Sequence, residues 1–493
     1  MGKHRTFLFL PQYRVLPAFF LCLLLAAFSS GCSGRVGTDA IRSGLSGGAV
    51  DVLEEELKET HESYGEFVTA CNLARVYQIN GRWRDSIKAF DDALVILEDY
   101  ENRAVINVRG VASRIGTMFF SRGADEYYGT GYERSLLHTF NALNYLMLGD
   151  FSGAAVEMRR MDKRQEVWLE ESQARIEKYL ESEKYLDSPD DLPSGYTMRD
   201  ILRNTEVREL VNNYQDAFSY AFAALVYRLD GDTQSARISI RRAAALDDAI
   251  RALAESAWPD KQAARKKGGE ISPSVLPRLH NGTSAANGKN AAPPTQEVAV
   301  VAFSGLAPAL KVENVRVWFP RIGYILIDLP SFNRPVFGNK PEVSVSGGNK
   351  NGGIPLHPLL HTDRLAYRTL WDEVRMEATF AITRAMTRVG VSAATYVAAS
   401  SNENTREYAS LIASLATVLM DIFATATSES IRNWETLPNT GYLGMGTVPR
   451  GSTVTVSVGG DKTAIDLPPD ARGVIIMATE LSNSKIKVNH VTY

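Results

Sequence analysis

The chain has 493 residues, of which 45% are hydrophobic and 23% are charged, and its formal net charge is −3 at pH 7. This composition is typical of a globular protein, and the length suggests more than one domain. No segment forms the basic stripe or basic domain that a nucleic-acid-binding protein needs, so we expect no nucleic-acid partner.

The first residues have the layout of a secretory signal. Basic residues precede an apolar run over 15–28, which is too short for a typical membrane-spanning helix. Small residues at 29–31 then lead to Cys32. This order predicts a signal peptide of the lipoprotein type over 1–31. A plain signal peptide and an uncleaved anchor are the alternatives.

The small residues before Cys32 resemble the bacterial lipobox, except that Ser29 stands where a leucine is usual. The resemblance implies that Cys32 becomes the first residue and carries acyl chains such as palmitate. Each buried CH₂ group contributes ~0.8 kcal/mol, so several chains on one residue hold a protein at a bilayer. Ser33 directly follows Cys32 and resembles the type of residue found at this position in lipoproteins that are sorted to the outer membrane. Of the other cysteines, Cys22 leaves with the signal and Cys71 is expected to be buried.

Three later segments share small, aromatic and glycine residues at the same spacing. The nine positions are Ala74, Tyr77 and Gly81; Ala142, Tyr145 and Gly149; and Ala224, Tyr227 and Gly231. The small residue permits two helices to approach closely, the tyrosine fills the groove one turn later, and the glycine ends the first helix with a left-handed cap. The pattern resembles the tetratricopeptide repeat, and three unrelated amphipathic hairpins are the alternative.

The copies are separated by more than the ~34 residues of a tandem unit, so other helices lie between them. We expect these at Asp51–His61, Val105–Phe120, Met161–Glu183 and Asp200–Tyr214. The prediction for 32–257 is therefore a tetratricopeptide-like helical solenoid with insertions. Such a solenoid offers a concave face for a partner.

The run from Tyr132 to His138, the segment from Glu157 to Arg160 and the run from Trp434 to Pro438 carry a further resemblance. They resemble a little-characterised family of bacterial outer-membrane lipoproteins with tetratricopeptide-like repeats. The resemblance implies an architecture and a location but no activity.

Four residues of the first run, Tyr132, Glu133, Arg134 and His138, have two interpretations. In one, they contact a partner. In the other, the charged residues pair with neighbouring helices, and His138 shares the packing face of Ala142.

Residues 258–295 are rich in Gly, Ser, Asn, Pro and Ala, which predicts a flexible linker. Beyond it, apolar residues alternate with a period of two, which predicts strands. The predicted strands are Val298–Phe303, Asn314–Phe319, Gly323–Leu329, Glu342–Val345, Thr453–Val458, Lys462–Leu467, Arg472–Met477 and Ser484–Val491. We expect 296–493 to be a β-rich domain, and the whole chain to be an α+β multidomain protein.

A block at about 363–436 interrupts the strands with helical spacing and many alanines. We expect an inserted helical hairpin packed within the protein. A membrane or oligomer contact by Ala409–Ala424 is the alternative, although Asp421 would be costly inside a bilayer.

The sequence contains only weak matches to catalytic and metal-binding motifs. His357 and His361 have ligand-like spacing, but neighbouring prolines disfavour a helix that would present both rings. The letters Gly-x-Ser-x-Gly at 44–48 lie in what we read as a tether, without the strand that a nucleophile elbow requires. Glycines 441, 444 and 446 are interpreted as turn residues before a strand. We expect no catalytic residues, no cofactor and no metal, and therefore no enzyme.

The sequence thus leaves three functional hypotheses. The favoured one is a membrane-anchored scaffold that binds envelope or periplasmic proteins through its repeats. The second is an accessory component of a machine that assembles or exports cell-wall material or polysaccharide. The third is a cryptic enzyme in the C-terminal domain.

Overall fold

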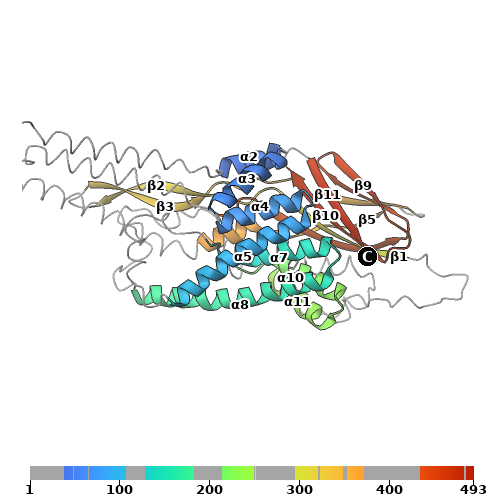
Figure 1. Cartoon of the computed structure of the whole chain (residues 1–493), viewed down its shortest axis with the longest axis horizontal. Coiled ribbons are helices and arrows are strands. Elements are labelled where there is room, and N and C mark those ends of the chain that lie inside the picture. The colour runs from blue at the N-terminus through green and yellow to red at the C-terminus, as the bar shows by residue number, and fades with distance from the viewer. Residues whose placement is uncertain are drawn as a thin grey trace, which may run out of the picture. The chain divides into compact units, whose positions relative to one another are not determined.

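The computed structural model describes residues 38–47, 49–64, 66–106, 128–182, 214–248, 250, 295–319, 323–347, 352–370, 433–481 and 485–493 (Figure 1). Several predicted features lie outside these ranges: the signal peptide 1–31, Cys32, the linker 258–295 apart from its last residue, the helix at 200–214 apart from Tyr214, and positions 371–432 of the helical insertion, which include Ala409–Ala424.

The first part of the described chain is helical. Its helices are α2 (Thr38–Gly47), α3 (Val50–Tyr64), α4 (Phe67–Ile79), α5 (Trp83–Ile106), α7 (Gly131–Met147), α8 (Phe151–Ser182), α10 (Ala217–Leu229) and α11 (Thr233–Leu246). Three antiparallel hairpins, α4–α5, α7–α8 and α10–α11, contain the three repeated sequence patterns. Neighbouring hairpins are in contact, α5 with α7 and α8 with α10.

The turn of each hairpin contains a glycine in the left-handed region. The φ angles of Gly81, Gly149 and Gly231 are 75°, 77° and 88°. Only glycine adopts this conformation without strain, so it ends the first helix and lets the second begin within three residues.

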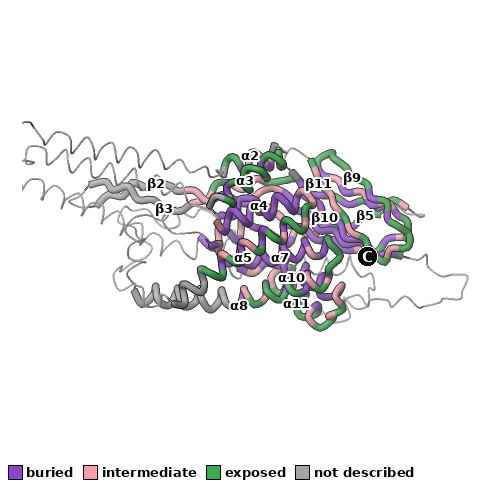
Figure 2. Tube along the Cα trace, viewed as in Figure 1, coloured by how far each residue is buried: buried purple, intermediate pink, exposed green. Residues whose placement is uncertain are grey.

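The first helices of the hairpins are buried on all sides. Every residue of α4 is buried, and so are all but one residue of α7 and all but one of α10 (Figure 2). A helix that is apolar around its whole circumference is typical of a position between two layers. The sequence of α10 fits this position because it is mostly apolar, whereas α4 also buries several polar residues among its apolar ones.

The second part of the described chain consists mainly of strands. They are β1 (Thr295–Ser304), β2 (Leu310–Phe319), β3 (Gly323–Phe332), β4 (Glu342–Ser346), β5 (Gly352–Gly353), β6 (His357–His361), β7 (Thr440–Pro449), β8 (Thr453–Val458), β9 (Asp461–Asp466), β10 (Gly473–Leu481) and β11 (Lys485–Thr492). All the strands predicted by the period of two are present.

These strands form a five-stranded sheet in the order β11-β10-β1-β7-β6, a four-stranded sheet in the order β5-β4-β8-β9, and the hairpin β2-β3. Strands β1 and β10 are parallel, and the other pairs are antiparallel. The fold is therefore α+β, as predicted.

The two larger sheets pack face to face around an apolar core. From β1, Val298, Val300 and Ala302 face Val454 and Val456 of β8 within this core. The next residue, Phe303, faces the opposite way and packs against aromatic residues of helices α7 and α10. Strand β1 is buried on both faces, which explains its uninterrupted apolar sequence. The described residues from Thr38 onward accordingly belong to one compact unit. Within it, helices pack on one face of the five-stranded sheet, and the second sheet packs on the other.

Two sequence interpretations were wrong. The predicted tether at 44–48 lies largely within α2, where a Cβ added to Gly44 would lie 3.2 Å from the Leu53 side chain of α3. The predicted turn glycines lie inside β7. A Cβ at Gly441 would be 2.9 Å from Leu360, and one at Gly444 would be 2.6 Å from Leu356, so these glycines make room for side chains near β6.

Candidate functional site

The residues predicted to pack the repeats lie inside the hairpins. Ala74, Ala142 and Ala224 are buried, as are Tyr77 and Tyr227, whereas Tyr145 is partly exposed. In the first hairpin the Ser86 hydroxyl of α5 donates a hydrogen bond of 2.7 Å to the carbonyl oxygen of Ala74 in α4. The small residues thus lie where two helices approach each other.

One face of the hairpins is covered by the C-terminal part of the same chain. The Phe303 ring of β1 packs against Phe140 of α7 and Phe218 of α10, with centroids 5.2 and 5.6 Å apart. Trp434, which is fully buried, makes edge contacts at 5.8 Å with both Phe90 and Phe140. The chain's own sheet layer thus covers one face of the hairpins.

The cluster that the family resemblance emphasised is buried. Tyr132 and Glu133 are 2% and 0% exposed. One Glu133 oxygen accepts a hydrogen bond of 2.8 Å from the backbone N–H of Thr130, and the other accepts one of 2.8 Å from the N–H of Trp434. Arg134 donates through Nε to the carbonyl oxygen of Tyr128 at 3.1 Å. These contacts favour the structural interpretation over a partner contact.

His138 is also buried and makes an internal contact. Its Nδ1 lies 2.8 Å from a carboxylate oxygen of Glu157, which also contacts Arg160 at 2.7 Å. Burial lowers the pKa of His138, and the hydrogen bond to Glu157 opposes this effect only in part. Arg160 already compensates the Glu157 charge, so a neutral imidazole donating through Nδ1 fits the site.

Asn72 makes the second polar contact between the helices and the C-terminal part. Its amide nitrogen donates to a Glu435 oxygen at 2.9 Å, and its amide oxygen accepts from the backbone N–H of Thr436 at 3.1 Å. All three residues are buried. A buried amide that is hydrogen-bonded through both its nitrogen and its oxygen favours one arrangement of the layers, since leaving either atom unpaired is costly.

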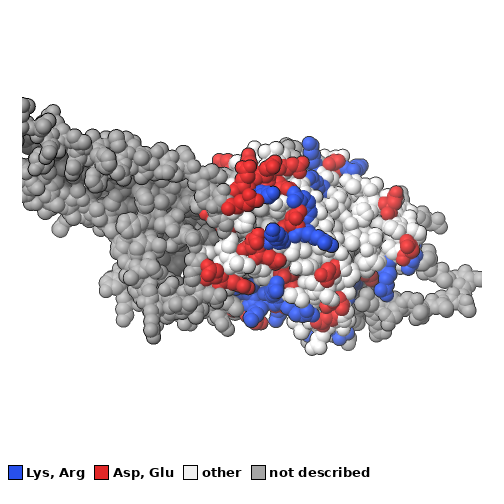
Figure 3. All heavy atoms as spheres, in the orientation of Figure 1, with Lys and Arg blue, Asp and Glu red and all other residues white. Residues whose placement is uncertain are grey.

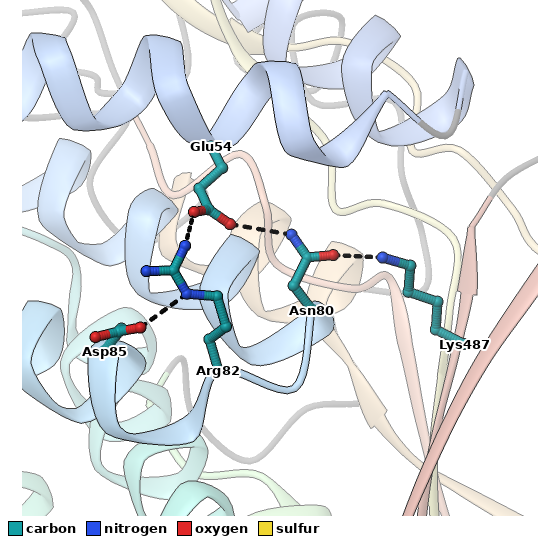
Figure 4. A network of polar contacts seen from close by, with 5 residues as sticks. All are labelled: Glu54, Asn80, Arg82, Asp85 and Lys487. Carbon is teal, nitrogen blue, oxygen red and sulfur yellow. Dashed lines mark hydrogen bonds and ion pairs between the residues drawn. The ribbon is translucent and has the colours of Figure 1, made fainter.

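A third contact lies at the exposed edge of the same junction. Figure 4 shows the Lys487 side chain reaching from β11 to Asn80, at the turn between α4 and α5. Asn80 donates to Glu54 of α3 at 3.1 Å, Glu54 also pairs with Arg82, and Arg82 contacts Asp85 at 2.7 Å. This series of contacts joins the α4–α5 hairpin to helix α3 and to strand β11 of the sheet.

The hairpins themselves carry an open hollow of about 300 Å³ between α8, α10 and α11. Its polar lining includes Asp162, Glu166, Tyr214, Tyr220 and Arg242. Arg242 pairs with Asp162 at 2.9 Å, and its guanidinium lies 5.6 Å from the centre of the Tyr220 ring. The hollow thus combines both charges with aromatic surface.

Burial affects the acids of this hollow. It raises the pKa of Tyr220 to about 12 and raises the pKa of Asp162, while the Arg242 charge opposes the shift of Asp162. Tyr220 therefore remains a neutral hydrogen-bonding group, and its hydroxyl accepts from Gln215 at 3.1 Å. On the face drawn in Figure 3, acidic and basic side chains are interleaved over the helical layer. This chemistry is suited to contacts with polar or charged groups.

Of the other residues that the sequence singled out, His357 and His361 lie on β6 rather than on a helix. Cys71 is buried, and desolvation raises its pKa well above the usual value. Within the described ranges, no three His, Cys, Asp or Glu residues gather as a metal site. Among the described helices, none is long and apolar enough to cross a membrane.

Comparison with protein-family models, with curated proteins and with solved structures finds no match to this chain.

Proposed function

We propose that this chain is a lipid-anchored scaffold of a bacterial cell envelope that binds other envelope proteins through its helical hairpins. In this proposal Cys32 carries the acyl chains. The hairpins of 32–257 form a tetratricopeptide-like solenoid, and the segment at about 363–436 is a helical insertion in the β-rich part.

The hollow between α8, α10 and α11 is the observation that supports binding through the hairpins. One face of the hairpins is already covered by the chain's own sheet, so a partner needs another surface. The hollow offers the exposed guanidinium of Arg242, behind which lie the largely buried rings of Tyr214 and Tyr220. Arginine and tyrosine are the residue types enriched where protein interfaces concentrate their binding energy.

Recovery of partners by crosslinking mass spectrometry on intact cells tests this proposal, with Arg242→Glu as the decisive variant. Reversing this charge places a carboxylate beside Asp162 and removes a donor from the hollow. We expect recovery of the partner to fall by about tenfold or more, which corresponds to the loss of one hot-spot contact.

The matched control is Arg241→Glu, which makes the same charge change at the neighbouring, exposed position of α11. This variant should retain the partner. Equal losses for both variants would assign the effect to net charge alone. Recovery of no partner from solubilised envelopes, even with crosslinking under mild detergent, would contradict the proposal as a whole.

The anchor has its own test. Intact-mass analysis of the purified protein should show cleavage before Cys32 and a diacyl or triacyl addition, both abolished by Cys32→Ser. An intact leader together with an unmodified thiol in a cytosolic pool would overturn the proposed location.

A further inference from the structure

A second cavity, of about 160 Å³, lies between the helices and one end of the five-stranded sheet. The parallel strands β1 and β10 both end here, at Ser304 and Leu481. Helices α2 and α4 and the loop before β4 complete the wall. Much of the lining is apolar and includes Leu45, Ile79 and Phe303.

Arg75 of α4 places a positive charge in this cavity. The side chain is 1% exposed, and its guanidinium lies 4.1 Å from the centre of the Phe140 ring and 5.3 Å from that of Phe303. Its NH1 contacts Gln78, but Nε has no hydrogen-bond partner and no carboxylate pairs with it among the described residues.

An unpaired buried cation is unusual. Burial lowers the pKa of Arg75 to about 9, so the group is still charged at neutral pH. The two aromatic rings supply part of the missing stabilisation. A buried charge is ordinarily paired, and the free Nε–H therefore marks a position for an acceptor group.

The sheet supplies complementary groups to the same cavity. Glu480 is 7% exposed and Thr479 is 6% exposed. One Glu480 oxygen accepts hydrogen bonds from the backbone and side-chain nitrogens of Asn339, at 3.0 and 2.9 Å. The other Glu480 oxygen and the Thr479 hydroxyl have no partner in the described part of the chain.

The backbone is built closely around this carboxylate. A Cβ added to Gly338 would lie 1.9 Å from the free Glu480 oxygen and 2.5 Å from the backbone nitrogen of Gly305, and because the backbone cannot give way easily, only glycine fits at this point of the loop. The next residue toward the N-terminus, Phe337, also lines the cavity and is 73% exposed. The cavity therefore combines enclosed charged groups with an exposed aromatic side chain.

We propose that this cavity binds a free α-amino acid with a small side chain, whose carboxylate contacts Arg75 and whose ammonium group contacts Glu480. A simple anion would leave the Glu480 oxygen unpaired and would be repelled by it. A simple cation would leave Arg75 unpaired. A ligand with both charges satisfies both groups at once, and the Thr479 hydroxyl supplies a further hydrogen-bonding group.

Calorimetry and thermal unfolding of the full-length protein in detergent micelles test this inference with glycine, L-alanine and D-alanine as probes. We expect saturable binding and a rise in Tm with ligand concentration, because a ligand of the folded state stabilises it. Acetate and methylamine, each of which carries one of the two charges, should bind at least about tenfold more weakly than glycine.

Two variants separate the two contacts. Glu480→Gln should weaken glycine binding by about tenfold or more and leave acetate binding unchanged or tighter. Arg75→Lys should weaken both, and it keeps a positive charge in case loss of the cation prevents folding. The exposed control Glu55→Gln on α3 should leave every affinity unchanged.

Three results would overturn the assignment. Acetate binding as tight as glycine, with no effect of Glu480→Gln, would identify a simple anion site. Equal losses in Glu480→Gln and Glu55→Gln would remove Glu480 from the site. No binding of any probe to the folded wild-type protein would leave only water in the cavity. The measurement uses purified protein without a partner, so its outcome is independent of the scaffold proposal.

Discussion

Glu133 of α7 accepts a hydrogen bond of 2.8 Å from the backbone N–H of Trp434, which follows it by 301 residues in the chain. The same carboxylate caps its own helix through the N–H of Thr130. A single buried side chain thus holds the second hairpin to the segment that leads into β7. Because such contacts are shared between layers, we expect helices and sheets to unfold together.

The first prediction concerns this contact. Glu133→Ala removes a charged hydrogen bond, worth ~1.5–3 kcal/mol, and a helix cap, worth ~1 kcal/mol. We expect the free energy of unfolding to fall by about 3 kcal/mol in urea titrations, with one transition by both circular dichroism and tryptophan fluorescence. Glu55→Ala on the exposed face of α3 should stay within about 0.5 kcal/mol of the wild type. Separate transitions for the two probes would show that the layers unfold independently.

The second prediction concerns the pH dependence that His138 contributes. Its pKa is lowered in the folded protein, so the unfolded chain binds more protons once the pH falls below the unfolded value of about 6.5. The contribution of His138 to the free energy of unfolding is therefore fully present above that pH and is lost on acidification. His138→Gln should remove this part of the slope between about pH 5 and 7. An unchanged slope in the variant would contradict the lowered pKa.

Asp216 gives a third prediction, of opposite sign. This buried residue caps α10 by accepting from the N–H of Ser219 at 2.6 Å, and burial raises its pKa to about 6. The unfolded value is about 3.9, so ionisation between these two pH values costs stability as the pH rises. Asp216→Asn keeps a capping acceptor without a charge. Relative to the wild type, we expect it to gain roughly 1–3 kcal/mol between about pH 4 and 7.5.

The outcome that contradicts this third prediction is a constant difference between Asp216→Asn and the wild type at all pH values. His138 and Asp216 change the free energy of unfolding in opposite directions with pH. Comparison of the two single variants with the double variant therefore shows how much of the pH dependence each residue contributes.

The fourth prediction compares two glycines with positive φ. Gly305 has a φ of 67°, and a Cβ there would lie 2.1 Å from the carbonyl oxygen of Val336. Gly149 has a φ of 77° and open space around it. Both alanine variants incur the left-handed cost of ~1–2 kcal/mol, and Gly305→Ala adds overpacking of ~1–3 kcal/mol. Thermal unfolding should therefore place Gly305→Ala clearly below Gly149→Ala, and equal Tm values would contradict the close approach.

The strands and the hairpins were predictable because their signals are local. Alternating apolar residues in 453–458 and the glycine of each hairpin depend only on neighbours in sequence. Strand β7 was missed because its glycines are usual in turns. These glycines are needed because the side chains of Leu356 and Leu360, which belong to the neighbouring segment, occupy the space that a Cβ would take.

The covered face of the hairpins was not predicted, although α4 carried a readable signal. A helix at the surface of a two-helix layer is expected to have one polar face that is exposed. In α4 the polar residues Asn72, Arg75 and Gln78 are spaced by three, but all of them are buried. Their spacing places them on one side of the helix. Buried polar residues on an otherwise apolar helix indicate a second packing partner, but not its identity.

The position of β1 has a consequence for how the protein forms. Val298 lies between Gly446 of β7 and Val474 of β10, and both neighbours are synthesised long after it. A nascent chain must therefore carry this apolar segment unpaired until almost the last strands emerge. Pairings so distant along the chain slow folding. A product truncated before residue 440 would expose an unpaired, aggregation-prone central strand and would not fold as a smaller domain.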